Sequence, residues 1–244
     1  MAIKPVILLD DGGVMNDNLL RGPQWQRLAG EFFAPRLGGK SEAWAEANRI
    51  HTLSIFEPEN WRTRTQAAPD YASFERVYWL DWLNGMCQLV GVGTPAEEEC
   101  LKLAREAEIF ITCRVHSAFP GAVEAICELH AQGYILHTAS GEPSFDLHGY
   151  LLAMGVRDYF CRLYGPDLLG VLKEKPEYYD RLFADVQIAP ADALLVDDNP
   201  RVLAWARDLG ATPVLVNAER KPVDGMLCIA SLAELPALVR QIYE

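Results

Sequence analysis

The stretch Val6–Asp17, VILLDDGGVMND, decides the fold of this 244-residue chain. Its first four residues form an uninterrupted apolar run, as in a strand that is buried on both faces of a parallel sheet. Gly12 and Gly13 then predict a tight turn, because glycine adopts backbone conformations that bulkier residues avoid. We therefore expect Asp10 at the carboxyl end of a buried parallel strand, which is where open α/β sheets bind ligands. Taken alone this signal is weak, since aspartate also forms ordinary turns.

Composition and charge restrict the class of protein. Half of the residues are hydrophobic, enough for a substantial core, and no apolar run reaches the length of a membrane span. The formal net charge is −12 with no run rich in lysine or arginine, so we expect no binding to nucleic acid or to a membrane. The six cysteines have no CxxC spacing, which argues against zinc and fits a reducing compartment. Residues 1–4 enter the strand pattern at once, so we expect no secretory signal and a cytoplasmic protein.

The order of the expected elements indicates two domains. From residue 20 to residue 116 no buried strand is evident, and the patterns are helical and rich in aromatic residues. Strand and helix alternate from residue 119 onwards, and the expected strands are 134–138, 159–163, 193–196, 213–216 and 226–229. This alternation predicts an α/β fold with a Rossmann-like parallel sheet and right-handed crossovers. We expect a core of residues 1–17 and 117–244, with an inserted all-helical subdomain at residues 18–116.

Polar residues stand at four points that a parallel sheet would bring to one edge. Asp10, Ser140, and the pair Asp197 and Asp198 follow expected strands, and a lysine opens an expected helix. Closely packed carboxylates repel one another and need a cation, and ligands that are all oxygen favour Mg²⁺. A carboxylate beside Mg²⁺ can attack phosphorus and form an aspartyl-phosphate that water later cleaves. The sequence therefore predicts a metal site with a nucleophilic carboxylate.

The other two positions can bind the transferring group. Ser140, followed by Gly141, can hydrogen-bond a phosphoryl oxygen, and a lysine can neutralise the charge on that group. Two lysines compete for this role. We favour Lys175 over Lys173 because Lys175 directly precedes Pro176, and proline is typical of the first turn of a helix.

These stretches resemble the four motifs of the haloacid dehalogenase superfamily, in the same order. The matching stretches are Leu8–Val14, Thr138–Gly141, Lys175–Pro176 and Val196–Asn199. The resemblance covers residues 3–17 and 119–243, and the helical insert matches the superfamily's cap in position and size. It implies Mg²⁺ and phosphoryl transfer, with Asp10 as nucleophile and metal ligand and with Asp198 and Asp197 holding the metal. We also expect Asp11, beside the nucleophile, among the groups that contact the phosphate.

One residue departs from the superfamily's phosphatase pattern. Gly12 stands where phosphatases carry a second Asp as general acid and base. Its backbone carbonyl can still ligate the metal, but it cannot donate a proton, a contribution of ~10²–10⁴-fold in rate. We expect a Mg²⁺-dependent phosphatase acting on a small phosphorylated metabolite, because a cap excludes large partners. Two alternatives stay open: a metal-independent hydrolase of the haloacid dehalogenase type, and a catalytically degenerate binding or regulatory module.

Overall fold

The computed structural model describes residues 4–243, and the expected start of the strand pattern at residues 1–3 lies outside them. The described chain divides into two compact units. The first comprises the described residues up to Asn18 and from Ser117 onwards, and the second is Leu19–His116. Within the described range, no helix combines the length and the apolar character needed to cross a bilayer.

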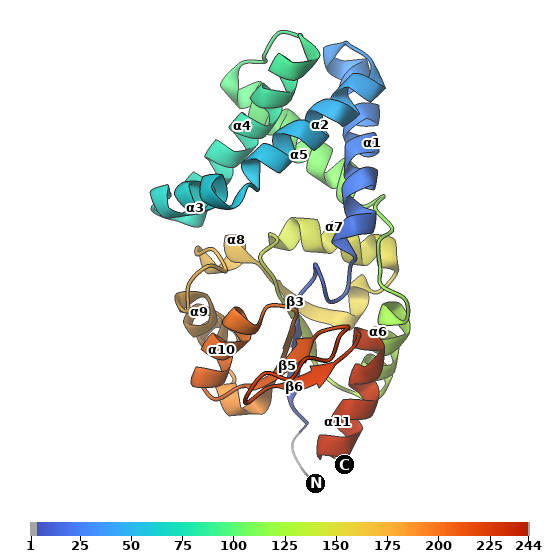
Figure 1. The fold of residues 1–244 in the computed structure, drawn as a ribbon, viewed down its shortest axis with the longest axis vertical. Coiled ribbons are helices and arrows are strands. Elements are labelled where there is room, and N and C mark those ends of the chain that lie inside the picture. Colours follow the sequence, from blue (N-terminus) through green and yellow to red (C-terminus); the bar gives the residue numbers. More distant parts are fainter. Residues whose placement is uncertain (1–3, 244) are drawn as a thin grey trace. The chain divides into compact units, whose positions relative to one another are not determined.

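The first unit contains a six-stranded sheet in which every neighbouring pair is parallel. The strands are β1 (Val6–Leu9), β2 (Leu136–Ala139), β3 (Phe160–Tyr164), β4 (Ala193–Asp197), β5 (Thr212–Val216) and β6 (Leu227–Ile229). Their order, β3-β2-β1-β4-β5-β6, confirms the predicted Rossmann-like parallel sheet. Figure 1 labels β3, β5 and β6 of this sheet. The chain runs outwards from β1 to β3 and then returns to place β4 on the other side of β1. This reversal between β1 and β4 is where open α/β sheets form a ligand-binding crevice at the carboxyl ends of their strands.

Helices cover both faces of this sheet. They are α6 (Ala122–Ala131), α7 (Ser144–Met154), α8 (Pro166–Leu169), α9 (Glu177–Val186), α10 (Pro200–Asp208) and α11 (Leu235–Tyr243). Short 3₁₀ turns lie at Arg157–Tyr159, Pro190–Asp192 and Leu232–Glu234. Residues of α6, α7 and α11 pack in one apolar cluster, and residues of α9 and α10 pack in another.

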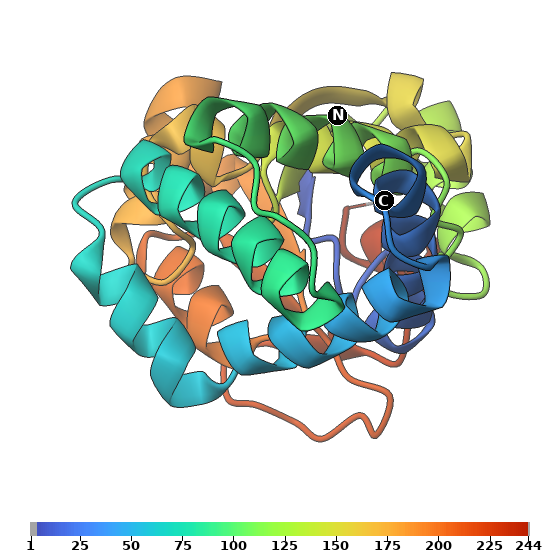
Figure 2. The ribbon, with the colours of Figure 1, turned by 90° about the horizontal axis from the view of Figure 1, so that it is seen from above.

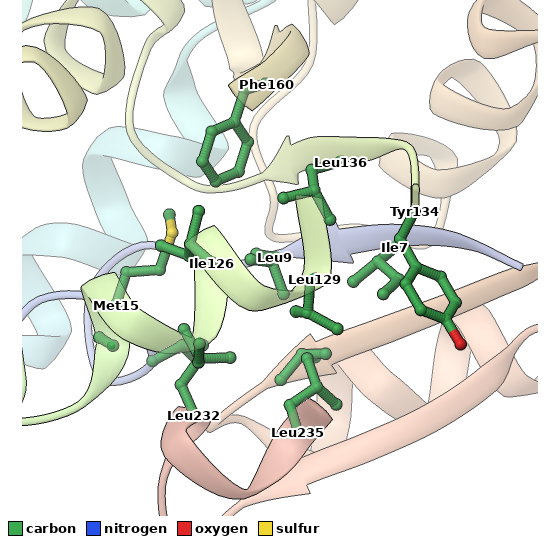
Figure 3. Packing of buried hydrophobic residues seen from close by; sticks show 14 of the residues in the cluster. Ile7, Leu9, Met15, Ile126, Leu129, Tyr134, Leu136, Phe160, Leu232 and Leu235 are labelled. Carbon is green, nitrogen blue, oxygen red and sulfur yellow. The ribbon is translucent and has the colours of Figure 1, made fainter. Parts of the chain in front are cut away.

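The side chains of β1 alternate between these two clusters. Ile7 and Leu9 belong to the first cluster, where Figure 3 shows them beside Leu136 and Ile126, and Leu8 belongs to the second. The side chains of Ile7, Leu8 and Leu9 are fully buried, and each contributes about 1.5–3 kcal/mol relative to an exposed position. Burial on both faces therefore fixes the strand that carries Asp10.

The second unit is entirely helical, as predicted. Its helices are α1 (Asn18–Leu37), which starts at the last residue of the first unit, α2 (Ser41–Ile55), α3 (Pro58–Ala67), α4 (Tyr71–Val90) and α5 (Glu97–Thr112). Helix α4 packs against both α2 and α5, which Figure 2 shows in blue and green. Phe33 stacks on Trp44 with ring centroids 5.1 Å apart and meets the edge of Trp82 at 5.5 Å. The expected role of this unit as a cap stays a prediction.

Candidate active site

The turn after β1 holds Asp10 at the edge of the sheet. The Asp10 amide donates to the Val196 carbonyl of β4 at 2.9 Å, which continues the strand pairing by one residue. Gly13 has φ +82°, and a Cβ atom there would lie 2.1 Å from Oδ2 of Asp198. Glycine is therefore required at position 13 both for the turn and for the close approach of the Asp198 carboxylate.

Three carboxylates gather at the ends of β1 and β4. Asp10, Asp197 and Asp198 each offer an oxygen, and these oxygens all lie within 4.8 Å of one another. The start of α10 fixes this arrangement: the side chain of Asn199 accepts from the amide of Arg201 at 3.0 Å, as expected of an N-cap. Oδ1 of Asp197 in turn accepts from the Asn199 amide at 2.8 Å. The structure thus brings together the three acidic residues that the sequence analysis proposed as metal ligands.

The lysine at this cluster is Lys173, and the preference for Lys175 was wrong. Nζ of Lys173 lies 3.0 Å from Oδ1 of Asp10 and 2.6 Å from Oδ2 of Asp197, and it donates to the Ala139 carbonyl at 2.7 Å. The Lys173 side chain is only 8% exposed, whereas Lys175 is on the surface. Proline at the start of a helix marks where α9 begins, but it does not determine which preceding lysine turns towards the sheet.

Burial and charge shift the pKa values in this cluster. Burial raises the pKa of Asp10 to about 6, although Lys173 partly opposes the shift. Burial also raises the pKa of Asp197 and that of Asp198, where the charge of Asp10 adds to the effect. For Lys173, burial alone would lower the pKa, but nearby anionic groups, Asp10 foremost, outweigh it and the pKa is well above its usual value. Three carboxylates thus face one permanently charged ammonium group.

Ser140 directly follows β2, and Thr138, two residues earlier, pairs with Leu9 at the end of β1. Its amide donates to the Tyr164 carbonyl at 3.1 Å, and its Oγ accepts from the Glu142 amide at 3.1 Å. The hydroxyl of Tyr178 donates to the Ser140 carbonyl at 2.8 Å. Gly141 is exposed, with open space where a side chain would start. The loop is therefore held by its backbone, and a proton remains on Oγ of Ser140 for donation.

The side chain of Asp11 lies inside the turn. It is fully buried, and one oxygen accepts from Nδ2 of Asn16 at 2.7 Å. Oδ1 of Asn16 accepts from the hydroxyl of Ser117 at 2.9 Å, so this network ties the turn to the segment that re-enters the core. The Asp11 side chain is thus held within the turn, and contact of Asp11 with the phosphate stays a prediction.

Sequence reasoning missed Tyr178, Asn16 and Asn18 as neighbours of the site. Tyr178 holds the Ser140 carbonyl, Asn16 holds the turn, and Asn18 lies against Gly12. The apolar pattern of α9 places Tyr178 in the core, but no spacing rule indicates where its hydroxyl points. The two asparagines meet their partners through the shape of the turn, which carries no periodic signal.

Fold and site together define an α/β enzyme core with a cluster of carboxylates at the carboxyl edge of a parallel sheet. The model of the haloacid dehalogenase-like hydrolase family matches residues 35–210, which is more than half of the chain. The chain therefore belongs to this family and is a hydrolase, which confirms the resemblance found in the sequence.

Two curated relatives are similar to part of the chain. Phosphoglycolate phosphatase of Rhodospirillum rubrum is 26% identical over 124 residues, which is 50% of this chain and 52% of that protein. Phosphoglycolate phosphatase of Vibrio vulnificus strain CMCP6 is 29% identical over 92 residues, which is 38% of this chain and 40% of that protein. The chain thus spans about half the length, or less, of these relatives.

Solved structures are similar over nearly the whole chain. The putative HAD-hydrolase YfnB from Bacillus subtilis, solved with bound magnesium, has a TM-score of 0.64 at 18% identity, covering 97% of this chain and 98% of that one. L-2-haloacid dehalogenase from Xanthobacter autotrophicus has a TM-score of 0.62 at 16% identity, with the same coverage. At these identities the likeness shows the fold alone, which is shared by more than one kind of hydrolase.

Proposed function

We propose that this hydrolase is a Mg²⁺-dependent phosphatase that acts through an aspartyl-phosphate on Asp10. The observation that carries the proposal is the cluster of Asp10, Asp197 and Asp198, whose oxygens lie within 4.8 Å of one another beside Lys173. The similarity to phosphoglycolate phosphatases supports it and points to a small phosphorylated metabolite as substrate.

The residues present fit a magnesium ion. The donors are all carboxylate oxygens, which Mg²⁺ prefers, and three carboxylates exceed the single charge of Lys173. Asp10, Asp197 and Asp198 would hold the ion, and the backbone carbonyl of Gly12 stays a predicted fourth donor. When bound, Mg²⁺ supplies positive charge to the phosphoryl oxygens and to the nucleophile.

Each neighbouring residue then has a definable task. An Asp10 oxygen attacks phosphorus, and Lys173 lowers the pKa of that carboxylate and orients it through the 3.0 Å contact. Ser140 donates its hydroxyl proton to a phosphoryl oxygen, since its lone pair already accepts from the Glu142 amide. Water completes the reaction by cleaving the aspartyl-phosphate.

A second candidate is a metal-independent hydrolase in which Asp10 attacks carbon and displaces halide. The observation that favours it is Gly12, because a displaced halide needs no proton donor at that position. The fold neighbour from Xanthobacter autotrophicus is a haloacid dehalogenase. Against it stand Asp197 and Asp198, because a nucleophilic carboxylate paired with lysine needs no further carboxylates nearby.

Turnover of p-nitrophenyl phosphate, with Mg²⁺ or with a chelator, separates these candidates. If the protein is the proposed phosphatase, its activity disappears with the chelator and in the variant Asp10→Asn. The surface variant Asp208→Asn keeps the activity. A panel of phosphorylated metabolites beginning with phosphoglycolate then identifies the substrate. Halide release from 2-chloropropionate that persists in the chelator would instead establish the second candidate. Inactivity in both assays would leave a binding or regulatory module.

A further inference from the structure

The space beside Gly12 is already filled by another side chain. A Cβ atom built on Gly12 would lie 2.9 Å from both Nδ2 and Oδ1 of Asn18, and 3.3 Å from its Cγ. Those distances are shorter than van der Waals contact, so the amide of Asn18 occupies the place where a side chain at position 12 would begin. In the phosphatase pattern, position 12 carries the second carboxylate, which this chain lacks.

The turn after Asp10 places Asn18 there. Residues 12 and 16 form a β-bridge, and the amide of Gly13 donates to the Asn16 carbonyl at 2.9 Å. The amide of Asp17 then donates to the Ser117 carbonyl at 2.7 Å, so the chain folds back over the turn before α1 begins. These bonds are all within the first unit. The position of Asn18 is therefore a property of the same turn that positions the proposed nucleophile.

The Asn18 amide is available for a ligand. Asn18 is exposed, and no other residue in the described range 4–243 hydrogen-bonds its side chain. A carboxamide offers both a donor, Nδ2, and an acceptor, Oδ1. It can thus make the hydrogen bonds of a carboxylic acid but cannot transfer a proton.

We infer that the carboxamide of Asn18 takes the place of the absent carboxylate at position 12. This inference rests on the proposed phosphatase function. In the first step an Asp10 oxygen bonds to phosphorus, and the bond to the leaving oxygen breaks with its electron pair on that oxygen. Nδ2 of Asn18 donates a hydrogen bond to this oxygen, and solvent water supplies the proton. In the second step a water attacks phosphorus while Oδ1 of Asn18 accepts a hydrogen bond from it. The bond to Asp10 then breaks, and the water's proton passes to solvent.

The inference predicts a characteristic dependence on the leaving group. Because no residue at this place donates a proton, p-nitrophenyl phosphate reacts much faster than phosphoglycolate, an alkyl phosphate. Asn18→Ala lowers kcat for both substrates about tenfold, the effect of one lost hydrogen bond, with little change in KM. Asn18→Asp supplies an acid and raises the rate for phosphoglycolate relative to p-nitrophenyl phosphate, most at low pH. Gln132→Ala is the matched control, since its amide lies just before β2, at the opposite edge of the sheet.

A double-mutant cycle tests the geometry. Gly12→Ala pushes the Asn18 amide out of its place, so it lowers kcat as Asn18→Ala does. The double variant Gly12→Ala/Asn18→Ala then loses no more than either single variant. Melting temperatures measured without Mg²⁺ establish that all three variants fold, because the displaced amide is the free end of an exposed side chain.

The outcomes are distinguishable. If the native chain hydrolyses no phosphate ester with Mg²⁺, the proposed function fails and the inference fails with it. If the native chain is an active phosphatase and Asn18→Ala has the same kcat as the native chain for both substrates, the proposed function stands and the role of Asn18 is overturned. Multiplicative losses in the double variant would likewise refute the shared position of Asn18 and residue 12.

Discussion

Replacing Lys173 by methionine tests the charge balance of the site directly. Methionine keeps the length and apolar stem of lysine but removes the ammonium group. That group has two carboxylate contacts, at 3.0 Å to Asp10 and 2.6 Å to Asp197, and one carbonyl acceptor. Lys175→Met is the matched control, because Lys175 is two residues away, has the same chemistry and is exposed.

The magnitude follows from the burial of these groups. The side chains of Lys173, Asp10 and Asp197 are 8%, 13% and 3% exposed, so solvent screens the loss only weakly. Removing one partner of a buried ion pair costs about 3–5 kcal/mol. We expect the metal-free Lys173→Met protein to lose about 3 kcal/mol of unfolding free energy near pH 8, which lowers Tm by roughly 6–12 °C. We also expect kcat to fall by ~10²–10³-fold, as when a single charge-stabilising donor is removed.

The pH dependence has a definite sign. The pKa of Asp10 is raised to about 6, so the folded state binds a proton more tightly than the unfolded state. The contribution of Asp10 to the free energy of unfolding therefore falls as the pH rises towards and through 6. Without Lys173 the pKa of Asp10 rises further, and the loss extends to higher pH. The variant is therefore close to the native protein in stability at pH 5 and clearly less stable at pH 8. Thermal melts at the two pH values, with phosphatase assays in parallel, measure this. Equal melting of Lys173→Met and native protein at pH 8, or an equal loss of turnover in Lys175→Met, would refute the reasoning.

Three further predictions concern the turn and the metal. Gly13→Ala places a Cβ 2.1 Å from Oδ2 of Asp198, so it weakens Mg²⁺ binding at least tenfold and lowers Tm, which titration calorimetry and melting check. Mg²⁺ affinity falls about tenfold per pH unit below 6, because Asp10 must release its proton, and calorimetry in buffers of different ionisation enthalpy detects that proton. Asp11→Ala removes the carboxylate acceptor of Nδ2 of Asn16 and leaves it the weak acceptor Sδ of Met154, so it costs about 1–3 kcal/mol, while kcat of the folded protein changes only a few-fold. A large loss of kcat without destabilisation would instead support contact of the Asp11 side chain with the phosphate.

The sheet was predictable because a buried parallel strand leaves a plain pattern. Val6–Leu9 is a continuous apolar run that Asp10 follows directly, and Ala193–Asp197 is an apolar run that ends in Asp197. Both are central strands in the structure. The strand expected at residues 134–138 begins instead at Leu136. The amide of Tyr134 donates to the Leu129 carbonyl at 3.1 Å, so Tyr134 still belongs to the turn that ends α6. The apolar pattern places a strand, but hydrogen bonds of the preceding helix set its first residue.

The candidate site was predictable only as far as sheet topology determines it. Asp10 and Asp198 meet because the carboxyl ends of adjacent parallel strands share an edge, which strand order alone dictates. Lys173 lies in an irregular loop, where neither helical nor strand periodicity indicates the direction of a side chain. Asp11 could not be placed by spacing either, because the turn, rather than an extended strand, decides which of two adjacent carboxylates faces Lys173 and which bonds to Asn16.

The charge balance of the site bears on which reaction it performs. A carboxylate whose pKa is about 6 is mostly ionised at neutral pH, but it becomes protonated, and so a poor nucleophile, as the pH falls to 6 and below. Lys173 alone does not prevent this protonation, because its ammonium group also contacts Asp197 and because Asp198 adds negative charge close by. A divalent cation bound by all three carboxylates would lower the pKa of Asp10 and make it fully nucleophilic. The acidic residues that raise the pKa of Asp10 are thus also the ones that would hold the metal, which supports the proposed phosphoryl transfer. In the proposed mechanism the metal would then support attack by Asp10, and departure of the leaving oxygen, beside Gly12, would be the step that limits substrates with poor leaving groups.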